Sequence, residues 1–328
     1  MALESTTMLV DKPVGRTGFG LLRLNAGPST EEAIPVMKAA LEAGCNLWSG
    51  AEYYGTPEYN SLHLVHSYFT KYPEDAEKVV LSIKGGYRNR FPDGSAEYIR
   101  QSVDNCNSIL AGTKSIDIFM LARVDKSVPI ETSLGALNEL VKESKIGAIG
   151  LSEVGAEKIE RACRVATIAA VELEVSLMAT DIFHNGVSQL CAKHNVVIIA
   201  YGVLGRGQLM FQSANDIPSA PFLRGFPRFQ SEAMEANMKL ILALRKVAER
   251  KGSTMAQLCI GWIKAMSKRG DTAELIPIPG STTVACAKEN GANVELSEKD
   301  IQEIDGILNQ YKVVGERYPP QMSSTWEE

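Results

Sequence analysis

Two adjacent tyrosines, Tyr53 and Tyr54, lie in a segment whose residue types suit proton transfer. The segment, residues 46–55, follows a helix expected to stop at Ala43-Gly44, and it opens with a short apolar run typical of a buried strand. A tyrosine where a loop leaves such a strand either packs against its neighbours or exchanges a proton with a bound molecule. Position alone favours packing, so other residues of the chain have to decide between the two roles.

Lys84 follows a second apolar run, residues 79–83, and could activate one of these tyrosines. A lysine at the end of a buried strand is costly unless it is paired or has a chemical task, although it could also extend its ammonium group into water. A nearby cation lowers the pKa of a tyrosine because it favours the phenolate. A tyrosine–lysine pair can therefore donate and accept a proton near neutral pH.

A second chemical signal lies near the carboxyl end of the chain, where residues 279–283 lead into a predicted helix. The backbone N–H groups and hydroxyls at a helix start bind phosphate well, which makes Ser281 and Thr282 candidate phosphate ligands. Lys288, further along the same helix, could add positive charge. The alternative is an ordinary helix cap of serine and threonine.

Apolar runs that alternate with helical patterns indicate which elements position these residues. Each run is followed by a helix, two of which begin with the capping boxes Ser29/Glu32 and Thr254/Gln257. No Asn-Gly turn joins two strands, so the pattern predicts parallel pairing with helices on both faces. Strands are expected at residues 18–22, within 46–55, and at 79–83, 116–121, 146–151, 169–173, 196–200 and 275–280.

Eight such units without a change of composition predict an α/β fold, a single (β/α)8 TIM barrel domain over residues 1–328. A doubly wound open sheet is the alternative, but no G-x-G-x-x-G follows the first strand. A long loop is expected at about 205–231 and a tail at about 311–328. Loops at 87–95 and 211–229 and the tail at 318–326 are expected to set specificity.

In such a barrel, function collects at the carboxyl ends of the strands. The residues at these predicted ends are 49–54, Lys84, Ala122, Arg123, Ser152, Glu153, Glu172, Glu174, Tyr201 and 280–282.

Composition excludes several other classes of protein. The net charge of −5 and the absence of a basic run argue against a nucleic-acid partner. No apolar stretch approaches the ~20 residues of a membrane helix, and no secretory signal is found. Six scattered cysteines are expected to be reduced thiols of a cytoplasmic protein, and the four histidines form no metal site. A monomer or weak homo-oligomer is expected.

Taken together, these segments resemble the aldo-keto reductases over essentially the whole chain, and most of all the pyridoxal reductase branch. The resemblance to that branch rests on the amino-acid sequences of residues 122–132 and 276–284. The family resemblance rests on the Gly-Phe-Gly opening at 18–20 and on residues 44–55, 83–85, 117–125, 150–153, 200–201, 204–207 and 276–282.

This resemblance implies a TIM barrel that binds NADPH without a dinucleotide fingerprint and reduces a small-molecule carbonyl, with pyridoxal to pyridoxine as the expected reaction. Tyr54 would be the general acid and Lys84 would tune it. The nicotinamide would be held by Ser152, Glu153, Glu172 and Tyr201, and the pyrophosphate covered by Gly202, Leu204, Gly205, Arg206 and Gly207. The adenosine 2′-phosphate end would meet Gly280, Ser281, Thr282, Lys288 and Asn290. The substrate would meet Leu22, Ser49, Ala122 and Arg123.

Four positions depart from the family pattern: Ser49 replaces an aspartate, Ala122 a histidine, and Cys286 an arginine at the adenosine phosphate. Glu172 stands where glutamine is common, and its carboxylate would still accept from the nicotinamide amide. Without the aspartate, Lys84 is expected to be a less compensated cation that lowers the pKa of Tyr54 further. Without the histidine, Arg123 or a water would hold the substrate oxygen, and Ala122 would leave space for a substituted aromatic aldehyde. A reductase of another carbonyl (aryl aldehyde, secondary-metabolite ketone or aldehyde) and a weakly active NADPH-binding regulatory protein remain alternatives.

Overall fold

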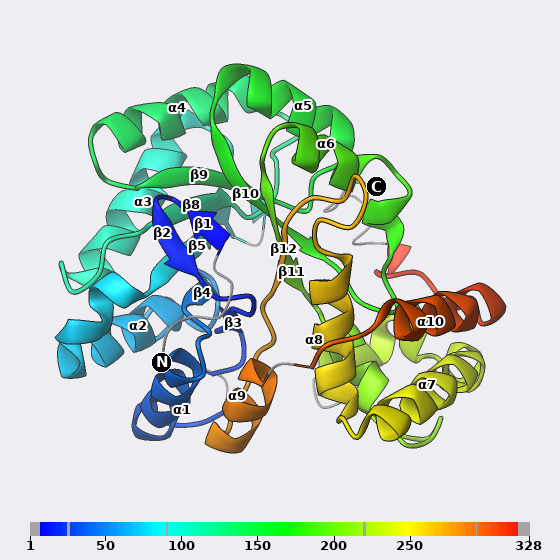
Figure 1. Ribbon diagram of the computed structural model, residues 1–328. Coiled ribbons are helices and arrows are strands. Elements are labelled where there is room, and N and C mark those ends of the chain that lie inside the picture. Colours follow the sequence, from blue (N-terminus) through cyan, green and yellow to red (C-terminus); the bar gives the residue numbers. More distant parts are fainter. Residues whose placement is uncertain (1–6, 25–26, 90, 219–220, 293, 321–328) are drawn as a thin grey trace.

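Eight parallel strands form one sheet that closes into a barrel, as the alternating pattern predicts (Figure 1). The computed structural model describes residues 7–24, 27–89, 91–218, 221–292 and 294–320. The strands follow one another around the barrel in chain order. They are β3 (Phe19–Gly20), β4 (Leu47–Ala51), β5 (Val80–Gly85), β8 (Ile118–Leu121), β9 (Ala148–Ser152), β10 (Ile168–Glu174), β11 (Val197–Tyr201) and β12 (Leu275–Pro277).

The first and last strands close the barrel. Gly18 N donates to Pro277 O at 2.8 Å, Gly20 N donates to Pro279 O at 3.2 Å, and Gly20 bridges Gly280. A Cβ atom on Gly20 would lie 2.9 Å from the carbonyl oxygen of Ile278, so a side chain there would push the two edges apart. The glycines of the Gly-Phe-Gly opening therefore serve closure of the sheet.

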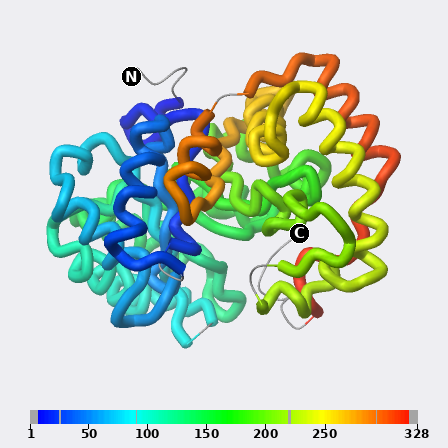
Figure 2. The backbone as a smooth tube through the Cα atoms, turned by 90° about the horizontal axis from the view of Figure 1, so that it is seen from below, coloured from blue at the N-terminus to red at the C-terminus, as the bar shows by residue number. Residues whose placement is uncertain are grey.

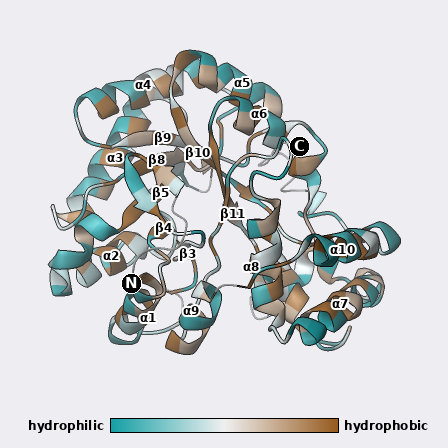
Figure 3. Cartoon of the chain, viewed as in Figure 1, coloured by the Kyte–Doolittle hydropathy of each residue, from teal (hydrophilic) through white to brown (hydrophobic). Residues whose placement is uncertain are grey.

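Ten α-helices in the described part of the chain surround this sheet, with brown apolar residues concentrated toward the strands and teal residues outward (Figure 3). The capping boxes predicted at Ser29 and Thr254 are confirmed, and Asn60 and Ser297 cap two further helices in the same way. The helices are α1 (Thr30–Glu42), α2 (Ser61–Lys71), α3 (Ala96–Leu110), α4 (Ile130–Lys142), α5 (Ala156–Val165), α6 (Val187–Lys193), α7 (Ser231–Lys251), α8 (Met255–Met266), α9 (Val284–Gly291) and α10 (Glu298–Gln310).

The barrel interior is apolar at the amino-terminal end of the strands and polar at the carboxyl end. Leu47, Val80 and Ile118 belong to one buried cluster inside the barrel, together with Leu9 and Val14. Leu9 and Val14 come from an antiparallel hairpin, β1 (Thr7–Leu9) and β2 (Lys12–Val14). The hairpin therefore covers the amino-terminal end of the barrel.

Two short antiparallel pairs outside the barrel were not predicted. In β1–β2 the turn residues Val10 and Asp11 both have left-handed φ, 48° and 59°. Such turns normally carry Asn-Gly or Asp-Gly, so the residue types of Val10 and Asp11 do not predict a turn here. The second pair joins β6 (Tyr87–Arg88) to β7 (Phe91–Pro92) in one of the predicted specificity loops.

The long segment after β11 folds back against the carboxyl tail. It contains the short 3-10 helices η3 (Gly205–Met210), η4 (Pro221–Gly225) and η5 (Pro227–Phe229). Leu223 and Phe226 from this segment pack against Tyr318 of the tail. Figure 2 shows α7 and α10, which flank these two segments in sequence, side by side at one edge of the barrel. Residues 219–220 of the predicted loop and 321–328 of the predicted tail lie outside the described residues.

All six cysteines are free thiols, as predicted, and four of them are buried. Within the described ranges, no helix has both the length and the apolar character that a membrane span requires.

Candidate active site

Three buried side chains at the carboxyl end of the barrel form a closed hydrogen-bonded group. Lys84 Nζ donates to Ser49 Oγ at 2.6 Å, and Ser49 Oγ donates to Glu172 Oε2 at 2.6 Å. Glu172 Oε1 lies 2.8 Å from Lys84 Nζ, and none of the three residues is more than 3% exposed. Ser49 and Lys84 come from the neighbouring strands β4 and β5, whereas Glu172 comes from β10 on another side of the barrel.

Glu172 supplies the negative charge that Ser49 lacks. The expectation that Lys84 is poorly compensated is therefore wrong, because a carboxylate from β10 reaches the ammonium group across the barrel. Glu172 was predicted to hold the nicotinamide, but here both of its oxygens are engaged by Lys84 and Ser49. Its position inside the barrel thus serves charge neutralisation of Lys84.

Tyr54 stands next to this group, in a loop that is fixed at both ends. Its backbone N donates to Ala51 O at 3.3 Å, and its carbonyl oxygen accepts from Ser61 N at 3.0 Å. Gly55, with φ of 119°, turns the chain directly after it. The ammonium nitrogen of Lys84 lies 5.1 Å from the centroid of the half-buried Tyr54 ring. The structure thus brings together the two residues that the sequence predicts to be catalytic.

The pKa of Tyr54 departs from its ordinary value in the direction opposite to the prediction. Burial raises the pKa of this phenol well above its ordinary value, and the Glu172 carboxylate raises it further, while Arg123 opposes both. Lys84 does not lower the pKa of Tyr54 as expected, because Glu172 neutralises the lysine and itself disfavours the phenolate. Tyr54 is therefore a protonated phenol across the neutral range, which is the form a proton donor needs.

The predicted substrate residues Ala122 and Arg123 follow β8 directly. Ala122 is 1% exposed, and its backbone N donates to Gly85 O at 2.9 Å. Arg123 Nη1 donates to Ala122 O, and Arg123 Nε is buried with no hydrogen-bond partner among the described residues. A buried N–H without a partner is costly, so a ligand oxygen would stabilise it. Leu22, in contrast, is 53% exposed on the loop after β3.

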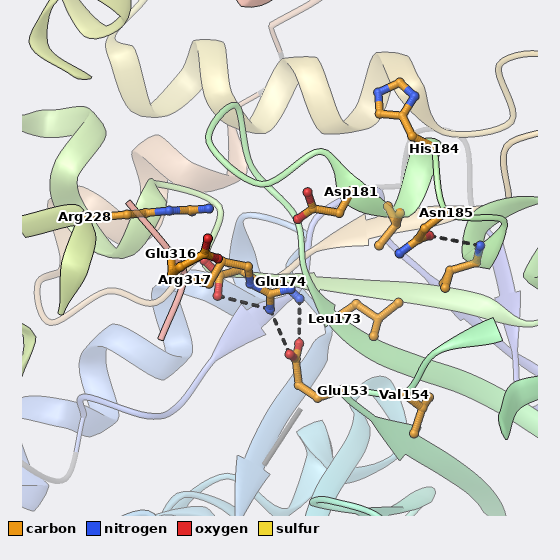
Figure 4. Close-up of a pocket in the computed structure, with 12 residues that line it drawn as sticks. Glu153, Val154, Leu173, Glu174, Asp181, His184, Asn185, Arg228, Glu316 and Arg317 are labelled. Carbon is orange, nitrogen blue, oxygen red and sulfur yellow. Dashed lines mark hydrogen bonds and ion pairs between the residues drawn. The ribbon is translucent and has the colours of Figure 1, made fainter. Parts of the chain in front are cut away.

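Two carboxylates and two arginines form a network beside Tyr201. Figure 4 shows Glu153, Glu174 and Arg317 of this network. Arg317 Nη2 lies 2.8 Å from Glu153 Oε2 and 3.4 Å from Glu174 Oε2, and Arg206 Nη2 lies 2.5 Å from Glu174 Oε2. Burial alone would raise the pKa of Glu174, but Arg206 and Arg317 hold it below its ordinary value. A cavity of about 360 Å³ adjoins this network, with Arg317 in its wall.

The carboxyl tail therefore contacts residues that were predicted to bind cofactor. Tyr318 Oη lies 3.0 Å from Tyr201 Oη, and the Arg206 guanidinium lies 4.3 Å from the centroid of the Tyr318 ring. Arg206, predicted to cover a pyrophosphate, is instead paired with Glu174. Arg317 was not predicted. Three acidic residues at the ends of β9 and β10 did signal that cations must lie near them, because buried carboxylates need partners.

The loop after β11 has a backbone suited to close approach of a ligand. Gly202, Gly205 and Gly207 have left-handed φ of 67°, 57° and 96°, and Arg206 between them has 57°. Ser152, at the end of β9, is 2% exposed, and Leu204 of this loop is half-buried. Gly205 N donates to Gly202 O at 2.7 Å and Gly207 N donates to Leu204 O at 3.0 Å, so the loop is a series of tight turns whose glycines allow close backbone approach. These residues fit the nicotinamide and pyrophosphate parts of a dinucleotide.

The start of α9 fits the adenosine end less completely. Thr283, rather than Ser281 or Thr282, is the helix cap, with its hydroxyl accepting from Cys286 N at 3.2 Å. Ser281 Oγ accepts instead from Asn290 Nδ2 at 2.8 Å, and Thr282 and Gly280 are exposed. Residues 280–287 include no basic side chain.

Lys288 does not join this group. It lines a separate cavity with Gly291, Ala292 and Glu295, at and beyond the carboxyl end of α9. The predicted cluster of Ser281, Thr282, Lys288 and Asn290 is thus only partly assembled.

Comparisons with known proteins agree with this architecture. Residues 16–309 match the model of the aldo/keto reductase family. A probable pyridoxal reductase 2 from Schizosaccharomyces pombe is 38% identical over 95% of this chain and 97% of its own length. A putative pyridoxal reductase from Saccharomyces cerevisiae is 35% identical over 92% and 95% of the two chains.

A third relative and a solved structure extend the comparison. The aldo-keto reductase yakc from Schizosaccharomyces pombe, whose name includes NADP(+), is 33% identical over 96% of this chain and 94% of its own. The structure of a glycerol dehydrogenase from Gluconobacter oxydans superposes with a TM-score of 0.82 over 95% and 97% of the two chains. At 22% identity, this likeness concerns the fold.

Proposed function

This chain belongs to the aldo/keto reductase family, and from that premise we propose that it is an NADPH-dependent reductase whose substrate is pyridoxal. The observation that carries the proposal is the placement of a protonated Tyr54 beside a buried lysine whose charge is balanced by Glu172. Two relatives have pyridoxal reductase in their names, and a third has NADP(+), which supports the choice of substrate and cofactor.

The proposed reaction divides the work between cofactor and chain. When bound, the reduced nicotinamide supplies a hydride to the carbonyl carbon. Tyr54 gives its phenolic proton to the carbonyl oxygen, and Lys84 stabilises the phenolate that remains. Ser49 and Glu172 hold the ammonium group in place during this step. Arg123 Nε offers its unsatisfied hydrogen to the substrate oxygen, the role that a histidine would have had.

The proposed cofactor residues have distinct tasks. Ser152, Glu153 and the Tyr201 ring would orient the nicotinamide, and the backbone of residues 202–207 would contact the pyrophosphate. Ser281, Thr282 and Asn290 would meet the adenosine end. Because Arg317 pairs with Glu153 and Tyr318 contacts Tyr201, the tail has to move or to form part of the cofactor site when the dinucleotide binds.

Steady-state assays with a carbonyl panel test the proposed function. Purified protein is mixed with NADPH and with pyridoxal, an aryl aldehyde or a ketone, and oxidation of the cofactor is followed by absorbance, with NADH in parallel. The highest kcat/KM is expected for pyridoxal with NADPH. Faster turnover of another carbonyl would assign a different substrate. Tight NADPH binding without turnover on any carbonyl would favour the regulatory alternative.

Replacing Ala122 with histidine is expected to lower kcat/KM for pyridoxal by about tenfold or more, with a smaller loss for a small aldehyde. The imidazole would fill space that the bulky aromatic aldehyde requires, because Ala122 is buried beside Arg123. Both substrates are measured with the wild type and the variant under the same conditions. Higher activity of Ala122→His on both substrates would contradict a role for Ala122 in substrate fit.

A further inference from the structure

A second, larger cavity of about 1350 Å³ lies at the amino-terminal end of the barrel. Its walls come from residues that directly precede β3, β4 and β5, and from the carboxyl ends of α1, α8 and α9. Tyr54 and Lys84 stand at the other ends of the same strands. At about 3.3 Å of rise per residue, strands of five or six residues separate the two sites by roughly 15–20 Å. The proposed active site therefore does not use this cavity.

Lys264 is the unusual residue of this cavity. It lies in the last turn of α8, and only 6% of it is exposed. Across the described ranges, its ammonium group has no ion pair and no hydrogen bond, although it lines the cavity. The carboxyl end of a helix favours a cation by at most about 2 kcal/mol. That contribution is smaller than the usual penalty for burying an unpaired ammonium, so a negatively charged partner would stabilise the group.

A second cation stands beside Lys264. Arg16 Nη2 donates to the backbone oxygen of Lys264 at 3.3 Å, and no carboxylate of the described chain pairs with Arg16. Burial lowers the pKa of Lys264 to about 8, and the positive charge of Arg16 contributes to this lowering. The Cys45 thiol opposes it only weakly, because burial raises the pKa of Cys45 to about 12 and keeps the thiol neutral.

Other groups around the cavity are already satisfied or lie at its rim. Asp75 is paired with both Lys38 and Lys78, and Lys12 is paired with Asp117 and Glu77. The remaining acids, Glu42 and Glu295, are exposed, as is Lys288. Thr17, next to Arg16, is 4% exposed, and its hydroxyl has no hydrogen-bond partner among the described residues. The unsatisfied donors therefore gather around Lys264 and Arg16.

We propose that this cavity is a binding site for a phosphorylated small molecule, whose phosphate lies between Lys264 and Arg16. A phosphate carries two negative charges and several acceptor oxygens, so it can bond an ammonium and a guanidinium together. The side-chain hydroxyl of Thr17, the residue after Arg16, offers a further donor. The cavity exceeds the size of a phosphate ion, which leaves room for the organic part of the molecule. The site is independent of the proposed reductase activity.

Titration calorimetry on the full chain tests this proposal, with NADPH present in excess to fill the proposed cofactor site. The probes are inorganic phosphate and glycerol 3-phosphate, with glycerol as the neutral control. Both phosphates are expected to bind, the ester more tightly, and added salt is expected to weaken both. Tighter binding of inorganic phosphate would identify the free ion as the ligand, whereas no heat with either probe would overturn the proposal.

Variants locate the binding. Lys264→Met is expected to weaken the binding of glycerol 3-phosphate at least tenfold, and Arg16→Gln to weaken it as well. Lys239→Met, an exposed lysine on α7, is the matched control and should bind like the wild type. Arg16 is only half-buried, so its variant keeps the test available if Lys264→Met fails to fold. Equal affinities in the Lys264, Arg16 and Lys239 variants would contradict the assigned position.

Site-specific titration gives a second readout. Lysines methylated with carbon-13 are followed by NMR, and the Lys264 signal is the one absent from Lys264→Met. A bound phosphate favours the protonated ammonium, so the pKa of Lys264 is expected to rise from about 8. A tenfold preference for the protonated form corresponds to about one pH unit. An unchanged titration of Lys264 at saturating glycerol 3-phosphate would contradict direct contact.

Discussion

Replacing Tyr54 with phenylalanine is expected to lower kcat for pyridoxal reduction by about 10²–10⁴-fold, because the change removes the only proposed proton donor. The ring remains, so its contacts with Lys84 and Tyr53 are kept. NADPH affinity should therefore stay close to that of the wild type. Stopped-flow measurement of hydride transfer and fluorescence titration of NADPH separate the two effects.

Tyr53 provides the matched control for this experiment. Its ring centroid lies 5.2 Å from that of Tyr54, and burial raises the pKa of its phenol as well. Tyr53→Phe removes an equivalent hydroxyl one residue away and is expected to retain most of the activity. Comparable losses in both variants would mean that packing of the tyrosine pair, rather than proton donation by Tyr54, limits the reaction.

Replacing Glu172 with glutamine is expected to lower the free energy of unfolding by about 3–5 kcal/mol, because it leaves the Lys84 ammonium buried without a counter-charge. Glutamine has nearly the same shape, so the loss reports charge rather than volume. Urea unfolding at neutral pH measures the difference. Glu235→Gln, on the exposed face of α7, is the control and should change the midpoint little.

The same variant is expected to change the pH profile of reduction. The Glu172 carboxylate raises the pKa of Tyr54, so its removal should lower that pKa. Tyr54 would then lose its proton at a lower pH, and the alkaline decline of kcat would begin earlier than in the wild type. Adding Ser49→Asp to Glu172→Gln should restore stability and the wild-type profile, because a carboxylate then stands beside Lys84 again. Failure of the double variant to recover either property would show that Glu172 does more than neutralise Lys84.

The barrel could be predicted because its evidence is local. Each strand is a short apolar run, and capping boxes such as Ser29/Glu32 mark where helices start. The hairpin β1–β2 could not be predicted in the same way, since Val10 and Asp11 adopt turn angles that their residue types disfavour. Tertiary contacts hold this turn: Leu9 and Val14 pack inside the barrel, and Lys12 pairs with Glu77 and Asp117.

In the candidate site, too, contacts between neighbouring strands could be predicted from the sequence, whereas contacts across the barrel could not. Tyr54 and Lys84 follow neighbouring strands, so the sequence places them together once parallel pairing is assumed. The contact of Glu172 with Lys84 depends on closure of the barrel and on which face of β10 turns inward, and no local pattern specifies either. The Arg317–Glu153 pair joins residues 164 positions apart, so the sequence indicates that Glu153 needs a cation but not which residue supplies it.

The pairing of Ser49 with Glu172 also has a consequence for the evolution of such barrels. If the counter-ion of the lysine can sit on either of two strands, the two positions should change together among relatives. A carboxylate at the position of Ser49 should accompany a neutral residue at that of Glu172, and the reverse should hold as well. A chain with neutral residues at both positions is expected to have lost the buried lysine or its activity. Inspection of one position at a time would thus misclassify active members as degenerate.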